Sequence, residues 1–93
     1  MKKIQFASVW DAVVDTPEAA ENMKLRSGLM MALKAHMERV GLSQSEAAKL
    51  CGVTQPRVSD LVRGKINLFG LDALLNMAAT VGLHVEMTVL DAA

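Results

Sequence analysis

The chain has 93 residues, which suits one domain with one modest hydrophobic core whose burial a dimer interface would extend. Ten basic and ten acidic residues give a net charge of zero, so overall charge does not identify a nucleic-acid binder. One cysteine excludes an intramolecular disulfide and a cysteine-cluster metal site, and no apolar run approaches the ~18 residues of a membrane span. No signal-peptide pattern opens the sequence, so we expect a cytoplasmic protein.

The charges are unevenly distributed along the chain. Residues 23–65 carry eight basic and three acidic side chains, a net charge of +5, so the two flanks together carry −5. A basic middle between acidic ends predicts that the two parts meet different partners.

The first 15 residues are expected to form an N-terminal arm. Residues 3–6 alternate polar and apolar, which suits a short strand or an extended arm, and Ser8 is placed to cap a short helix over residues 9–14. The only tryptophan, Trp10, lies there. It would dock on the core of its own domain or on a dimer mate, or it would anchor a partner protein.

A long helix is predicted next. Thr16 is an N-cap, Pro17 takes the first helical position, and Glu18 places a negative charge at the positive end of the helix dipole. The helix should run to about Val40. Its expected buried face holds Leu25, Leu29, Leu33, Met37 and Val40, with Met30 and Ala32 at its edges and Met23 and Met31 outside it.

Two short helices joined by a tight turn are predicted over residues 41–64. Ser43 and Glu46 form a capping box, Gly52 ends the first helix, and Thr54 caps the second helix, whose first turn accommodates Pro56. The first helix should bury Ala47, Ala48, Leu50 and Cys51, the last as a small core residue. The second should bury Val58, Leu61 and Val62, and expose Gln55, Arg57, Ser59, Asp60 and Arg63.

This outward set is typical of a helix that reads DNA. Glutamine and arginine bond base edges in pairs, serine and threonine bond phosphates or bases, and aspartate accepts from cytosine. The pattern predicts a helix-turn-helix motif whose second helix enters the major groove N-terminus first. The alternative is a pair of packed helices that binds no nucleic acid.

The rest of the chain is predicted to close the domain. Lys65 and Asn67 lie in a loop beside the DNA backbone, and a helix then buries one face before Gly82 ends it. That face holds Leu71, Leu74, Leu75, Ala78 and Val81. Residues 83–90 alternate strictly, which predicts a strand that pairs with residues 4–6 or with the same strand of a second protomer.

No catalytic or metal-binding pattern is present. The two histidines, His36 and His84, belong to no metal or catalytic motif, and there is no glycine-rich phosphate loop. We expect His84 and Glu86 to form an exposed polar pair. The chain is therefore predicted to be no enzyme and to need no cofactor or metal.

The run LSQSEAAKLCGVTQPRVSDLVRGK (residues 42–65) resembles the Xre/lambda-repressor-like helix-turn-helix family, and NLFGLDALLNMAATVG resembles the fourth helix of that domain. The longer pattern, with VWDAVVDTPEAAENMKLRSGLMMALKAHM before and LHVEM after, is similar to a narrower group of HigA-type antitoxins and regulators. The implied fold is mainly α: a helix-turn-helix bundle of about five helices with a short C-terminal β-strand and an N-terminal strand or arm. Its parts are an arm (1–15), a DNA-binding domain (16–82) and a C-terminal strand and tail (83–93).

The resemblance implies a homodimer that binds double-stranded DNA at a near-palindromic operator, with no membrane association. The implied DNA-binding residues are Gln44, Thr54, Gln55, Pro56, Arg57, Ser59, Asp60, Arg63, Lys65 and Asn67. Pro56 and Asp60 depart from the usual family pattern, because many relatives carry a polar base reader at the first and an acid near DNA is unusual at the second.

The function that the resemblance implies is that of an antitoxin, which represses its own operon and neutralises a RelE-like toxin. Two alternatives remain open: a free-standing dimeric Xre-type repressor, and a protein-interaction module without DNA binding.

Overall fold

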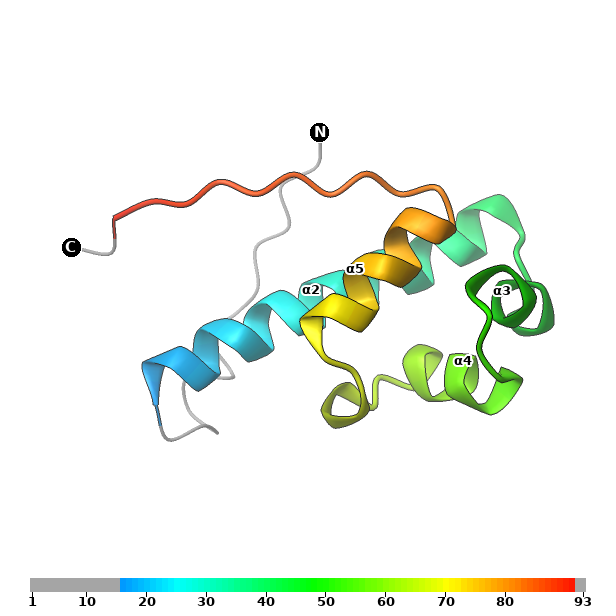
Figure 1. Ribbon diagram of the computed structural model, residues 1–93, viewed down its shortest axis with the longest axis horizontal. Helices are drawn as coiled ribbons and strands as arrows, with labels where there is room; N and C mark the ends of the chain where they lie inside the picture. The colour runs from blue at the N-terminus through cyan, green and yellow to red at the C-terminus, as the bar shows by residue number, and fades with distance from the viewer. Residues whose placement is uncertain (1–15, 92–93) are drawn as a thin grey trace.

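The computed structural model describes residues 16–91, and these residues are mainly helical (Figure 1). They form α2 (Pro17–Val40), α3 (Gln44–Cys51), α4 (Gln55–Val62), the short 3-10 helix η1 (Ile66–Leu68) and α5 (Leu71–Thr80). The described part thus holds four α-helices, not about five. The short helix and the arm predicted before residue 16 lie outside it.

The long helix α2 begins and ends where the sequence predicted. The Thr16 side chain accepts a hydrogen bond from the Ala19 amide at 3.1 Å, and Gly41 ends the helix in the left-handed conformation at φ 71°. The predicted buried face is only partly right, because Leu25 and Val40 are exposed while Met30 is buried. The first turns of α2 extend beyond α5 in Figure 1, so this face lacks a covering helix near its start.

The caps of α3 and α4 are also confirmed. The Ser43 amide donates to Glu46 at 3.0 Å, and the Glu46 amide donates to the Ser43 hydroxyl at 3.1 Å. Gly52 adopts φ 66° after α3, and the Thr54 hydroxyl accepts from the Arg57 amide at 3.3 Å. In each of these eight-residue helices, the capping side chain therefore satisfies one amide of the first turn.

One residue of α3 was placed wrongly. Ala47 and Ala48 are buried and Cys51 packs against the core, all as predicted, but Leu50 is 55% exposed. Cys51 lies four residues after Ala47 and three after Ala48, on the same face of the helix, whereas Leu50 lies two residues after Ala48, on nearly the opposite face.

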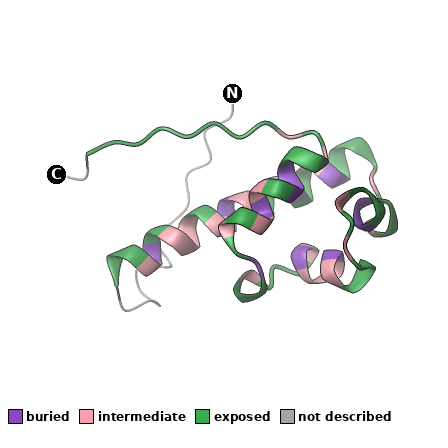
Figure 2. Ribbon diagram, in the orientation of Figure 1, coloured by how far each residue is buried: buried purple, intermediate pink, exposed green. Residues whose placement is uncertain are grey.

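The core lies where α2, α3, α4, α5 and the residue after η1 meet (Figure 2). Its largest fully buried side chains are Phe69, Leu33, Leu61, Leu74 and Val58. The sequence analysis did not single out Phe69. Its position between η1 and α5 means that the loop after α4 is anchored in the core.

The predicted C-terminal strand is wrong for the described chain. After Gly82 (φ 94°) the backbone runs extended through residues 83–91, but it pairs with no other strand there (Figure 1). The alternation of polar and apolar residues correctly predicted an extended backbone. A strand also needs a hydrogen-bonding partner, which the described residues do not supply. Val85, Met87, Val89 and Leu90 are exposed as a result.

Candidate nucleic-acid interface

Helices α3 and α4 form the helix-turn-helix, with residues 52–54 as the turn between them. The turn depends on the positive φ of Gly52 and on the Thr54 cap. The Val53 amide also donates to the Ala48 carbonyl at 3.0 Å, which closes the end of α3. The local sequence therefore fixes how α4 leaves the turn.

All ten predicted DNA-binding residues lie at the start of α3, along α4 or in the loop after it. Six of them, on α4, its caps or the following loop, are exposed: Thr54, Gln55, Pro56, Arg63, Lys65 and Asn67. The other four are half-buried: Gln44, Arg57, Ser59 and Asp60. Two of the half-buried side chains have specific partners within the protein.

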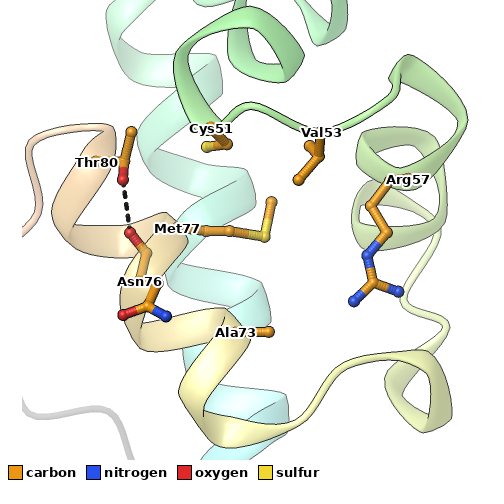
Figure 3. Close-up of a pocket in the computed structure, with 7 residues that line it drawn as sticks. All are labelled: Cys51, Val53, Arg57, Ala73, Asn76, Met77 and Thr80. Atoms are coloured by element: carbon orange, nitrogen blue, oxygen red, sulfur yellow. Dashed lines mark hydrogen bonds between the residues drawn. The ribbon is translucent and has the colours of Figure 1, made fainter.

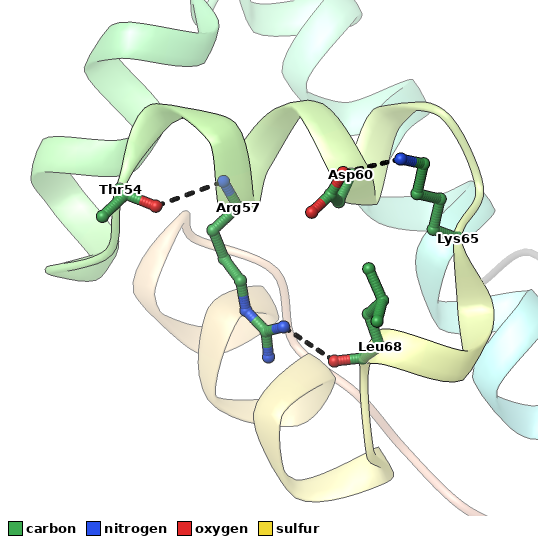
Figure 4. A network of polar contacts seen from close by, with 5 residues as sticks. All are labelled: Thr54, Arg57, Asp60, Lys65 and Leu68. Carbon is green, nitrogen blue, oxygen red and sulfur yellow. Dashed lines mark hydrogen bonds and ion pairs between the residues drawn. The ribbon is translucent and has the colours of Figure 1, made fainter.

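The Arg57 side chain, predicted to face outward, is half-buried and folds back along the protein surface. Its guanidinium lies 4.0 Å from the centre of the Phe69 ring, and its Nη1 donates a hydrogen bond of 2.7 Å to the Leu68 carbonyl (Figure 4). An arginine stacked on an aromatic face and bonded to a carbonyl is held by two favourable contacts. Nothing in the local sequence could have revealed this pair, because the partners lie 11 and 12 residues further along the chain.

Asp60 forms an ion pair with Lys65. Its carboxylate lies 3.3 Å from the lysine Nζ, and the Lys65 amide donates to the Asp60 carbonyl at 3.0 Å (Figure 4). The acidic charge on α4 is thus balanced within the protein, and so is the positive charge of Lys65.

Two titratable groups of α3 differ from their ordinary behaviour. The hydrogen bond from the Ser43 amide, together with the Ser43 side chain, lowers the pKa of the Glu46 carboxyl. Burial raises the pKa of the Cys51 thiol, which fits its packing against the core.

A hollow of about 230 Å³ opens between the α3–α4 turn and α5 (Figure 3). Its walls include Val53, Met77 and Ala73, and Arg57 lies at its edge. The side of Arg57 that faces the hollow is therefore not packed by other side chains.

The histidines have structural partners. His36 Nε2 donates to the Val81 carbonyl at 2.7 Å and so ties α2 to the end of α5, a contact that sequence reasoning missed. His84 pairs with Glu86 at 3.4 Å on the exposed tail, as expected. Within residues 16–91 no cluster of three or more histidine, cysteine or acidic side chains could hold a metal.

Two short capped helices, a left-handed glycine between them and a third helix that buries their inner faces define a helix-turn-helix domain. Comparison of the sequence agrees with this class, because residues 12–90 match the family described as "Helix-turn-helix domain". The chain belongs to this family.

A solved structure described as "Putative XRE Family Transcriptional Regulator" is similar over 77% of this chain and 81% of its own, with 32% identity and a TM-score of 0.71. No curated protein matches the sequence. None of the helices in residues 16–91 is both long and apolar enough to cross a membrane.

Proposed function

We propose that the protein is a sequence-specific DNA-binding transcriptional regulator that places α4 in the major groove of double-stranded DNA. The observation that carries the proposal is the capped α3–turn–α4 unit, whose second helix presents Thr54, Gln55 and Arg63 to solvent. Family membership supports it, as does the similarity to the XRE regulator.

Nine of the ten residues contact DNA directly in this proposal, and their roles differ. Gln44 lies at the N-terminus of α3, where free amides and the helix dipole favour a phosphate. Thr54, Gln55 and Ser59 face bases or the nearby backbone, with Pro56 between them in apolar contact and Asp60 accepting from cytosine. Arg63, Lys65 and Asn67 bind phosphates, which position the helix without reading sequence.

Binding should be tested by fluorescence anisotropy with labelled DNA from upstream of the protein's own gene, at two salt concentrations. We expect binding that weakens as salt rises and exceeds binding to scrambled DNA of the same composition. Absence of binding at low salt would overturn the proposal and favour a protein-interaction module.

A homodimer is the second part of the proposal. The tail after Gly82 alternates, is extended and exposes Val85, Met87 and Val89, so pairing with the same segment of a second copy would satisfy its backbone and cover these side chains. A two-fold dimer binds half-sites about 34–36 Å apart, hence the near-palindromic operator. Removing residues 83–93 should convert a dimer into a monomer in sedimentation equilibrium. The same oligomeric state with and without the tail would contradict this.

An antitoxin role is the finer proposal, in which the protein represses its operon and neutralises a RelE-like toxin in the cytoplasm. The net charge of −5 on the flanks supports it, because acidic segments would speed encounter with a basic ribonuclease. Changing Asp11, Asp15, Glu18 and Glu21 to amides should slow association with the toxin encoded beside the gene. Undiminished rate and affinity would favour a free-standing repressor.

A further inference from the structure

Arg57 is the basic residue of α4, and its charged group folds back against the protein surface. Its guanidinium is held at the carbonyl of Leu68, the last residue of η1, and at the ring of Phe69, the next residue. Its backbone amide is held by the Thr54 hydroxyl and carbonyl at the start of α4. The side chain therefore reaches from the first turn of α4 to the far end of the loop that follows α4 (Figure 4).

The loop is attached to α4 at its near end as well. There the Asp60 carbonyl accepts from the Lys65 amide, and the two side chains form an ion pair. Residues 65–68 are thus fixed to α4 at both ends. Asn67, an exposed residue of η1, lies between the two attachments.

Steric packing does not account for the position of Arg57. The guanidinium borders the open hollow between α4 and α5, so space is available beside it (Figure 3). The hydrogen bond and the cation–π contact hold it instead. A methionine at this position would fit the same space but would have neither contact.

We propose that Arg57 is a positioning residue. It sets the geometry between α4 and the loop after it (residues 65–68) rather than reading a base itself. The inference rests on the proposed function and refines it. To bind one DNA duplex, the protein must place α4 in the major groove and, at the same time, Lys65 and Asn67 on the phosphate backbone. If the loop moves relative to α4, phosphate contacts are lost and the helix sits less firmly over every base pair.

The first test needs no DNA. In the structure the Leu68 and Phe69 amides donate to the Lys65 and Ile66 carbonyls, and these hydrogen bonds close η1. In Arg57→Met both amides should exchange with solvent about tenfold faster, the factor that corresponds to a charge-assisted bond of roughly 1.4 kcal/mol. The Val53 amide, at the end of α3, should keep its rate. Unchanged exchange at Leu68 and Phe69 would overturn the inference.

The second test selects binding sites from a library of randomised DNA duplexes with wild-type protein, Arg57→Met and Gln55→Ala. Arg57→Met should lower discrimination across all base pairs of the site and flatten the salt dependence, whereas Gln55→Ala should relax one base pair. Relaxation at a single base pair in Arg57→Met, with unchanged salt dependence, would identify a base reader and overturn the inference. Loss of active protein alone would leave both discrimination and salt dependence unchanged, and would also overturn it.

A third variant separates positioning from contact. Phe69 is 1% exposed and cannot touch DNA, so Phe69→Leu removes the aromatic face beneath Arg57 without altering the DNA-facing surface. It should reproduce the loss of discrimination, and adding Arg57→Met should cost little more. Additive effects would contradict the shared role. If Phe69→Leu does not fold, amide exchange in Arg57→Met decides alone. Failure of the wild-type protein to enrich any sequence would refute the proposed function instead.

Discussion

Replacing Asp60 by asparagine is expected to strengthen binding to DNA of random sequence. Asp60 holds Lys65 at 3.3 Å, and both side chains are partly exposed, at 28% and 48%. Such a pair contributes less than about 1 kcal/mol to folding, so Asp60→Asn should fold normally. It should remove a negative charge from the surface that meets DNA, so that the phosphates no longer share the positive charge of Lys65 with a carboxylate.

The magnitude follows from counterion release. One additional unit of net positive charge at the interface neutralises one more phosphate charge, which steepens the dependence of log K on log salt by about 0.9 per protomer. Between about 50 and 200 mM salt, the variant should then lose about 3.5-fold more affinity than the wild-type protein.

Anisotropy titrations on a random-sequence duplex would measure this difference. Glu38→Gln is the matched control, since it makes the same change of charge on α2, outside the α3–α4–η1 surface. An unchanged slope in Asp60→Asn, or an equal change in Glu38→Gln, would refute the reasoning.

Three further substitutions test the fold that supports this surface. Gly52→Ala should cost about 1 kcal/mol and lower the melting temperature by about 4–8 °C, because φ 66° strains a residue with a Cβ although no atom lies within 4 Å of it; Gly52→Asn should cost less, and equal stability of all three proteins would contradict this. The lowered pKa of Glu46 gives stability that is present above the unfolded pKa and is lost as pH falls through the folded pKa. Glu46→Gln should therefore lose less stability on acidification in urea titrations, and identical acid profiles would argue against the cap. Leu74→Ala, at 0% exposure, should cost about 2–5 kcal/mol in urea unfolding, whereas Leu50→Ala should change stability by less than about 0.5 kcal/mol; similar costs would show that Leu50 is buried in solution.

Local sequence signals predicted the helix-turn-helix accurately. Caps and turns depend on residues within three or four positions of one another, such as Ser43 with Glu46 and the glycine at 52. The same holds for the start and end of α2 at Thr16 and Gly41. Because these contacts are local in the sequence, they do not depend on tertiary packing and can be predicted from a single sequence.

The errors arose where a residue depends on a distant partner. The local pattern around Arg57 could not indicate its contact with Phe69, because only the folded chain brings that ring beneath the guanidinium. Leu50 and Val40 are apolar at the edges of buried faces, and the packing of neighbouring helices decides which edge is covered. The alternation of residues 83–90 predicted an extended backbone, but a strand depends on a second segment that the pattern does not identify.

The central claim is that α4, the start of α3 and the loop after α4 contact DNA. Chemical-shift mapping on 15N-labelled protein, titrated with a duplex from upstream of its own gene, tests this most directly. The account predicts the largest changes at Gln44, Gln55, Ser59 and Asn67, with little change along the middle of α2. Changes confined to α2 and the C-terminal tail, with α4 unaffected, would contradict it.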